Sequence, residues 1–212
     1  MKTVWIIMFV IIFMVIFQSC ETGYTKKNGQ WTWVTNDENF GKRNHWIEGI
    51  DINSFKVLMK NKNFGADKHT VYFKGRKVNY AIPDGFEPLT DTEYGYAKDR
   101  QRVFLDNEVI IKADPNTFTI LEFPYSKDKN DVYCGTLPMG LSKNEMEEFK
   151  VTNTEKYMKG SKTTTILSEF LKFNPKYQWI ESLDIKVEKV IVGTGGTAET
   201  KSRKFIGLNE VK

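Results

Sequence analysis

The sequence predicts a mainly β protein, an array of about four stacked β-hairpin repeats with a small α+β cap at the C-terminal end. The first observation is a spacing of 31, 32 and 31 residues between four phenylalanines, Phe55, Phe86, Phe118 and Phe149. The second is a set of repeated aspartates, each followed by Val and an aromatic residue: Asp67, Asp99 and Asp128. The third is a change of pattern after residue 152, where these markers stop. A period of about 31 residues is typical of units that stack to bury their apolar faces.

Each unit is expected to be a hairpin that turns at its aspartate. An aspartate at the start of a turn accepts hydrogen bonds from its own backbone two residues on, so the three repeated aspartates are predicted to be turn formers. Asn130 stands where a left-handed residue suits a tight turn, whereas His69 and Gln101 tolerate that conformation less well. In a degenerate first unit, Asn36 takes the Asp place and Phe40 the Val place.

The elements expected outside the hairpins follow from local signals. Ser142 with Glu145 is a capping-box pattern and predicts a short helix before Phe149. Apolar spacing over 166–171, stopped by Asn174-Pro175, predicts an amphipathic helix. Residues 185–192 and 202–208 are expected to form strands, with the Gly-rich stretch 193–197 as a hairpin loop rather than a phosphate-binding loop.

The N-terminus has the pattern of an export signal. Val4 to Phe17 is an apolar run of 14 residues. As a helix it would be about 21 Å long, too short for a hydrocarbon core of about 30 Å. The run ends at Ser19-Cys20 and resembles a bacterial lipoprotein signal, in which cleavage before the cysteine leaves Cys20 to carry lipid. An ordinary cleaved signal and an uncleaved anchor are the alternatives.

These observations divide the chain into a signal peptide (1–19), a hairpin-repeat region (20–152) and a C-terminal α+β capping segment (153–212). The chain contains two cysteines. With Cys20 lipidated, Cys134 has no disulfide partner in the chain, and its place in the repeat matches the apolar Phe73 and Leu105. Cys134 is therefore expected to be a small buried hydrophobe rather than a nucleophile.

Asp128-Lys129-Asn130 followed by Val132-Tyr133 resembles the DKNYY repeat family of bacterial exported proteins, many of them lipoproteins. Asp67-Lys68 with Val71-Tyr72 and Asp99-Arg100 with Val103-Phe104 are variants of the same motif. The resemblance is strong over residues 60–140, weak over 24–59 and ends near 153. It implies an exported repeat protein and implies no reaction.

A catalytic or metal-binding role has little support in the sequence. A row of repeated aspartates could bind a cation or a sugar, but Ca²⁺ takes six to eight oxygens and each turn would offer one carboxylate. The two histidines, His45 and His69, lack a second ligand at metal spacing. We therefore expect no enzyme activity, no metal and no cofactor. Asp99→Ala should cost about 1 kcal/mol, and Asp99→Asn should be nearly harmless because Asn also forms such turns.

Three functions remain open. The first is a membrane-anchored envelope scaffold that binds a protein or glycan partner, for which Trp31 and Trp33 are a weak candidate surface. The second is an accessory structural lipoprotein without a discrete ligand, and the third is an envelope glycan hydrolase. A formal net charge of +4, with no long basic run, does not indicate a nucleic-acid partner.

Overall fold

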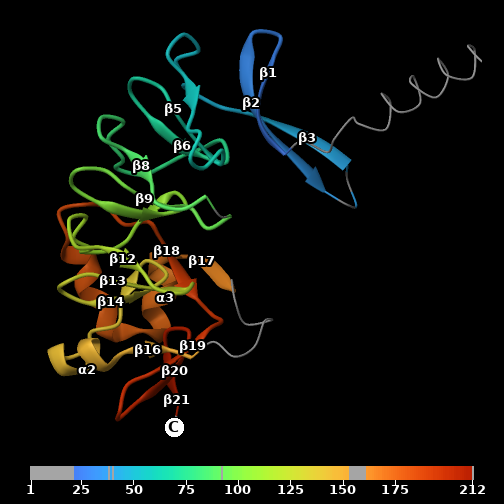
Figure 1. The fold of residues 1–212 in the computed structure, drawn as a ribbon. Coiled ribbons are helices and arrows are strands. Elements are labelled where there is room, and N and C mark those ends of the chain that lie inside the picture. The colour runs from blue at the N-terminus through green and yellow to red at the C-terminus, as the bar shows by residue number, and fades with distance from the viewer. Residues whose placement is uncertain (1–21, 38, 40, 92, 153–160, 212) are drawn as a thin grey trace, which may run out of the picture.

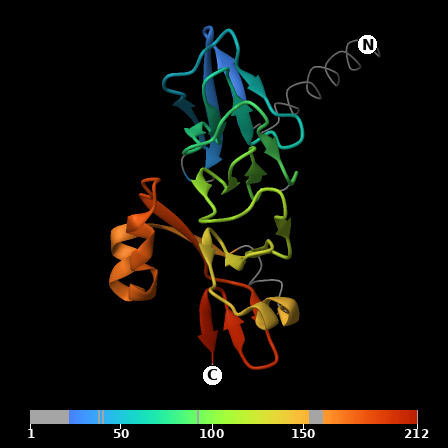
Figure 2. The ribbon, with the colours of Figure 1, turned by 90° about the vertical axis from the view of Figure 1, so that its left-hand side faces the viewer.

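The computed structural model describes residues 22–37, 39, 41–91, 93–152 and 161–211. The predicted mainly β class is confirmed, with 39% of the structure in strands and 12% in helices. The strands form several small antiparallel sheets that follow one another along the chain (Figure 1). Viewed from the side, the sheets form an elongated stack, and the orange helices stand beside it (Figure 2).

Three successive four-stranded sheets form the middle of the stack, each with its strands in chain order. We call the four strand positions a, b, c and d. The first sheet contains β4 (Lys56–Val57), β5 (Phe64–Ala66), β6 (Val71–Phe73) and β7 (Arg76–Lys77). The second contains β8 (Glu87–Pro88), β9 (Tyr96–Lys98), β10 (Val103–Leu105) and β11 (Glu108–Val109). The third contains β12 (Thr119–Ile120), β13 (Tyr125–Lys127), β14 (Val132–Cys134) and β15 (Leu137–Pro138).

A further sheet has the same order, but its a strand is separated from the rest by an insertion. Its strands are β16 (Lys150–Val151), β19 (Thr197–Glu199), β20 (Lys204–Ile206) and β21 (Asn209–Val211). The insertion between β16 and β19 carries β17 (Lys162–Ile166), α3 (Leu167–Phe173), the 3₁₀ helix η1 (Pro175–Ser182) and β18 (Lys189–Gly193). The boundary expected at residue 152 therefore lies inside this sheet.

The N-terminal sheet is a three-stranded meander of β1 (Gly23–Lys27), β2 (Gln30–Asp37) and β3 (Gly41–Trp46). Asn36 lies within β2, paired with Lys42. The carboxylate at the β2–β3 turn belongs to Asp37, whose Oδ1 accepts a hydrogen bond from the Asn39 N–H at 2.8 Å. The expectation that Asn36 holds the Asp place is therefore wrong by one residue, and Phe40 lies outside the described residues.

The phenylalanines that recur about every 31 residues each make the same core contact in their own unit. Each marker stands directly before an a strand and packs against the aromatic residue of the c strand in the same sheet. The pairs, with ring centroids 5.7 to 6.3 Å apart, are Phe55–Tyr72, Phe86–Phe104, Phe118–Tyr133 and Phe149–Phe205. The four markers belong to four successive apolar clusters, so one aromatic contact is repeated along the stack.

The left-handed backbone conformation expected at Asn130, in the turn between the b and c strands, occurs instead in the turn between the c and d strands. Residues with positive φ begin the turn between the c and d strands in all four sheets: Lys74 (48°), Asp106 (55°), Gly135 (66°) and Gly207 (55°). The turns at His69, Gln101 and Asn130 have matching hydrogen bonds. The predicted difference among these turns is therefore not present.

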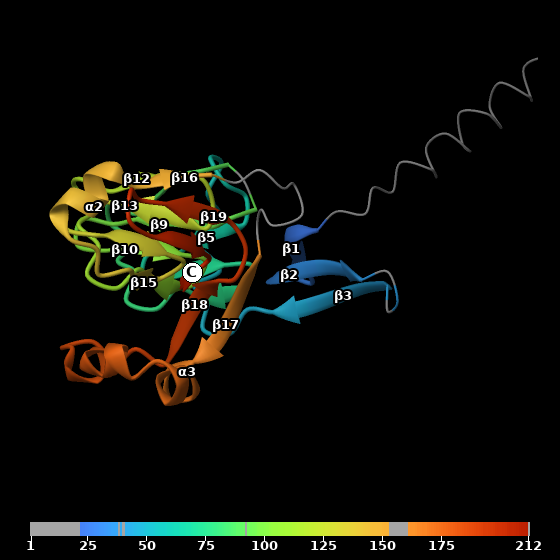
Figure 3. The same ribbon diagram turned by 90° about the horizontal axis from the view of Figure 1, so that it is seen from below.

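The inserted strand β18 runs along the edge of the stack and ties several units together. Thr136 donates its N–H to the Ile191 carbonyl at 2.8 Å, and its Oγ1 accepts the Ile191 N–H at 2.9 Å. Further along, the Leu208 N–H donates to the Gly193 carbonyl at 3.2 Å. We call β18 with its paired strand β17 the strap (Figure 3).

The strap explains why two of the four c–d turns begin with glycine. A Cβ at Gly135 would lie 2.1 Å from the Ile191 carbonyl oxygen, and a Cβ at Gly207 would lie 2.2 Å from that of Gly193. The strap backbone therefore occupies the space of a side chain at both turns.

Two predicted helices are confirmed. α2 (Lys143–Glu148) has Ser142 as its N-cap, with the complete capping box to Glu145, and α3 (Leu167–Phe173) has Asn174 as its C-cap. Within the described residues no helix is long and apolar enough to span a bilayer. The loop after Gly193 joins β18 to β19 in a different sheet, so its assignment as a hairpin loop is wrong.

Candidate functional site

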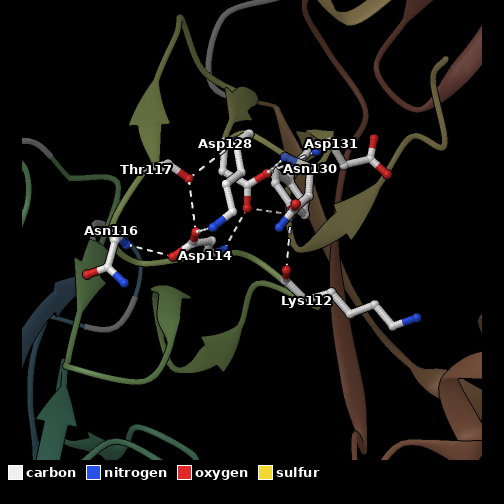
Figure 4. A network of polar contacts seen from close by, with 9 residues as sticks. Lys112, Asp114, Asn116, Thr117, Asp128, Asn130 and Asp131 are labelled. Carbon is white, nitrogen blue, oxygen red and sulfur yellow. Dashed lines mark hydrogen bonds and ion pairs between the residues drawn. The ribbon is translucent and has the colours of Figure 1, made fainter. Parts of the chain in front are cut away.

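The repeated aspartates connect each turn to the preceding loop, as the Asp128 cluster shows (Figure 4). Asp128 Oδ1 accepts the N–H groups of Asn130 and Asp131 at 2.7 and 2.9 Å. Its Oδ2 accepts the N–H of Asp114 at 2.6 Å and the hydroxyl of Tyr133 at 2.9 Å. Burial raises the pKa of Tyr133 above its usual range, which keeps the hydroxyl protonated as a donor. Through these four hydrogen bonds, one carboxylate connects its own hairpin to the preceding loop at Asp114.

Asp67 repeats this arrangement. Its Oδ1 accepts the N–H groups of His69 and Thr70 at 2.7 Å, and its Oδ2 accepts the Asp51 N–H at 2.9 Å and the Tyr72 hydroxyl at 3.3 Å. Burial alone would raise the pKa of Asp67, but these donors outweigh it and lower the pKa below its ordinary value. The side chain is therefore held as an anion by donors that all belong to the fold.

Asp99 keeps three of these four contacts. It accepts the Gln101 and Arg102 N–H groups at 2.7 and 2.8 Å and reaches the Ile82 N–H at 3.0 Å. The c-strand aromatic residue is Phe104 here, so the hydroxyl donor is replaced by an apolar ring. The three backbone contacts, two within the turn and one to the preceding loop, are common to all three aspartates.

The basic residue after each aspartate, or after Thr200 in the last sheet, adds a second link to the segment before the a strand. The ion pairs are Lys68–Asp51 (2.9 Å), Arg100–Asp84 (3.1 Å), Lys129–Asp114 (2.6 Å) and Lys201–Glu148 (2.6 Å). In the last of these units Thr200 replaces the aspartate, and its Oγ1 accepts the Arg203 N–H at 3.1 Å. The ion pair is thus kept where the carboxylate is lost.

These contacts assign the repeated aspartates to the framework of the stack. Within the described part of the chain, no group of three or more His, Cys, Asp or Glu side chains could hold a metal ion. The carboxylates of Asp67, Asp99 and Asp128 already accept three or four hydrogen bonds each.

The candidate surface at Trp31 and Trp33 is wrong because Trp33 is buried and Trp31 is half-buried against the apolar cluster at Phe55. Trp33 is 3% exposed and packs edge-on against Tyr24, with ring centroids 4.9 Å apart. Trp31 packs against Phe55 at 4.9 Å. Their alternation on β2 is therefore the signature of a core face.

Cys134 is fully buried in β14, with its thiol 3.6 Å from the Gly193 carbonyl oxygen. Burial raises the pKa of this thiol to about 12, so it stays protonated and unreactive at neutral pH. Cys20 and the signal peptide lie outside the described residues.

A groove that the sequence did not indicate lies where the N-terminal sheet, two c–d turns and the strap meet. It has a volume of about 430 Å³. Its lining includes His45 and Trp46 from β3, Lys74 and Arg76 from the first c–d turn and the strand after it, and Lys162 from β17. β3 and β17 lie on the same side of the stack (Figure 1). Trp46, a large aromatic residue at the end of an otherwise polar strand, was the one sequence feature that could have indicated this groove. The other walls come from segments that are distant in the sequence.

The DKNYY family model matches residues 33–94 and 76–194. The chain belongs to the DKNYY family. The match extends through the insertion to residue 194, well beyond the limit near 153 at which the resemblance in the sequence ended. No curated protein and no solved structure matches the chain.

At residues 128–133 the structure shows which contact each residue of the DKNYY motif makes. The Asp fixes its own turn and the preceding loop, and the Lys pairs with an acid of that loop. The Tyr at the c strand donates to the same Asp and packs on the repeated phenylalanine. The motif is therefore a set of contacts that stacks one unit on the last.

Proposed function

We propose that this DKNYY protein is a non-enzymatic binding scaffold, anchored to the bacterial cell envelope through lipid on Cys20. Two features support the anchor: the 14-residue apolar run from Val4 to Phe17 and the cysteine at its end. The membrane contact is then made by lipid, while the stack of sheets projects from the surface and presents its sides to a partner.

The main support for a scaffold role is that the repeated carboxylates hold the fold together. Side chains that could act as acids, bases or ligands accept backbone N–H groups from two segments each. Such carboxylates hold the units in register and present a fixed surface. The groove at Trp46 is one part of that surface where polar and basic side chains are open to a ligand.

The anchor is tested by mass spectrometry of the native protein. We expect an N-terminal peptide that begins at Cys20 and carries the mass of a diacylglyceryl group. A single acyl chain gives marginal anchoring and several chains give stable anchoring, so the mature chain should stay in the membrane fraction. Cys20→Ala should stop lipid labelling. An unmodified Cys20, or a mature protein that starts at another residue, would overturn the proposed anchor.

A further inference from the structure

We propose that the groove between β3 and β17 binds an acidic oligosaccharide, with a sugar ring on Trp46 and its carboxylate at Arg76. This inference rests on the proposed binding function and names the ligand class of its site. The groove volume, about 430 Å³, is within the range of sites for small molecules.

Trp46 supplies the platform. It is 53% exposed at the end of β3, whereas Trp33 on the neighbouring strand is 3% exposed. An indole has a flat apolar face, and the C–H groups of a sugar ring can lie against such a face while its hydroxyls stay in water. Trp46 is thus placed to receive a ring at the mouth of the groove.

The charges of the groove favour an anion. Lys74, Arg76 and Lys162 line it, and Asp106 is the one acidic side chain that the described residues add to the lining. Asp106 is already engaged, since its Oδ2 pairs with Lys162 at 2.5 Å and its Oδ1 accepts the Gly95 N–H at 3.1 Å. Arg76 forms no ion pair with any described residue. Its planar guanidinium can donate two parallel hydrogen bonds to a carboxylate.

The remaining polar groups suit a ligand rich in hydroxyls. Thr35 and His45 lie on one side, with Thr35 Oγ1 3.2 Å from His45 Nε2, and Asn107 and Thr164 complete the lining. These side chains offer both donors and acceptors. An acidic peptide would use the cations but would gain little from an open indole beside hydroxyl and amide groups.

The test is a calorimetric titration of the full chain in detergent micelles with tri-galacturonate. A neutral galactose trimer and tri-glutamate serve as comparison ligands. We expect binding of tri-galacturonate, and at least a tenfold weaker affinity in Trp46→Ala and in Arg76→Gln. Trp46→Phe should keep part of the affinity because a smaller ring remains. Phe173→Ala and Lys150→Gln, an exposed aromatic and an exposed base away from the groove, should bind as the wild type does.

Several results would overturn the proposal: no binding of tri-galacturonate, equal binding of the neutral trimer, tighter binding of tri-glutamate, or unchanged affinity in both groove variants. The unfolding temperature of each variant shows whether a loss of affinity reflects a loss of folding. Absence of binding would leave the lipid anchor untouched, since the mass of the Cys20 peptide tests that separately. Cleavage of the trimer would instead contradict the proposed non-enzymatic role.

Discussion

At the scale of single residues, the second oxygen of each repeated aspartate changes what a substitution should do. In Asp67 both oxygens accept hydrogen bonds, one from the turn and one from the loop at Asp51. An asparagine keeps one acceptor oxygen, so it can serve the turn or the loop but not both. The expectation that Asp99→Asn is nearly harmless applies to an isolated turn, but Asp99, like Asp67, also accepts a hydrogen bond from the preceding loop.

We predict that Asp67→Ala lowers the free energy of unfolding by about 2 kcal/mol and that Asp67→Asn lowers it by about 1 kcal/mol. Urea unfolding at neutral pH measures both values. Calcium chloride should leave the unfolding temperature of the wild type unchanged. A calcium-dependent increase that Asp67→Asn abolishes would show that the carboxylate is a ligand instead.

The same residue predicts a pH dependence. The pKa of Asp67 is lowered from 3.8 in the folded state, so its stabilisation is fully present above pH 3.8 and is lost as the pH falls through the folded pKa. As the pH falls below about 4, the urea midpoint of the wild type should therefore fall more steeply than that of Asp67→Asn. Parallel slopes would mean that Asp67 has the same pKa in the folded and unfolded states.

At the scale of elements, local signals were enough for α2, α3 and the hairpins of the central sheets. The capping box at Ser142 and the Asn174-Pro175 stop act within a few residues of the helix they bound. The last sheet was not predicted, because β16 and β19 are separated by the insertion and Thr200 stands where the other units carry aspartate. Because the insertion breaks the spacing and Thr200 replaces the repeated aspartate, the repeat pattern does not indicate the pairing of β16 with β19.

The contact between the strap and the third sheet is tested by two glycines. Gly135 and Gly140 have φ values of 66° and 68°, and both would place an alanine in the left-handed region. A Cβ at Gly140 meets no atom within 4 Å, whereas one at Gly135 would lie 2.1 Å from the Ile191 carbonyl oxygen.

Gly140→Ala should therefore cost about 1–2 kcal/mol, the price of the left-handed conformation. Gly135→Ala should cost clearly more, because the strap must also move away. Chemical denaturation of the two variants beside the wild type measures the difference. Equal losses would show that β18 does not lie against this turn in solution.

At the scale of the whole molecule, the candidate groove could not be read from the sequence. Trp46, Arg76 and Lys162 belong to three segments that only the stacked sheets and the strap bring together. The repeated aspartates, predicted to be turn formers, belong to the framework of the stack, whereas the β2 tryptophans, the weak candidate surface, pack against the core. The repeated residues mark the contacts between neighbouring units. The exposed side chains of the groove do not recur from unit to unit, so no periodic pattern indicates them.

The central claim is that one continuous stack extends from β4 to β21 and that the strap joins its units. Native-state hydrogen exchange of the full chain, followed by mass spectrometry, tests it most directly. Stacked units unfold together only as far as their interfaces couple them. We predict that the amides of Thr136, Ile191 and Leu208, which join the strap to two sheets, exchange as slowly as the paired amides of β13 and β14. Exchange of residues 161–211 as an independent, faster unit would contradict the account.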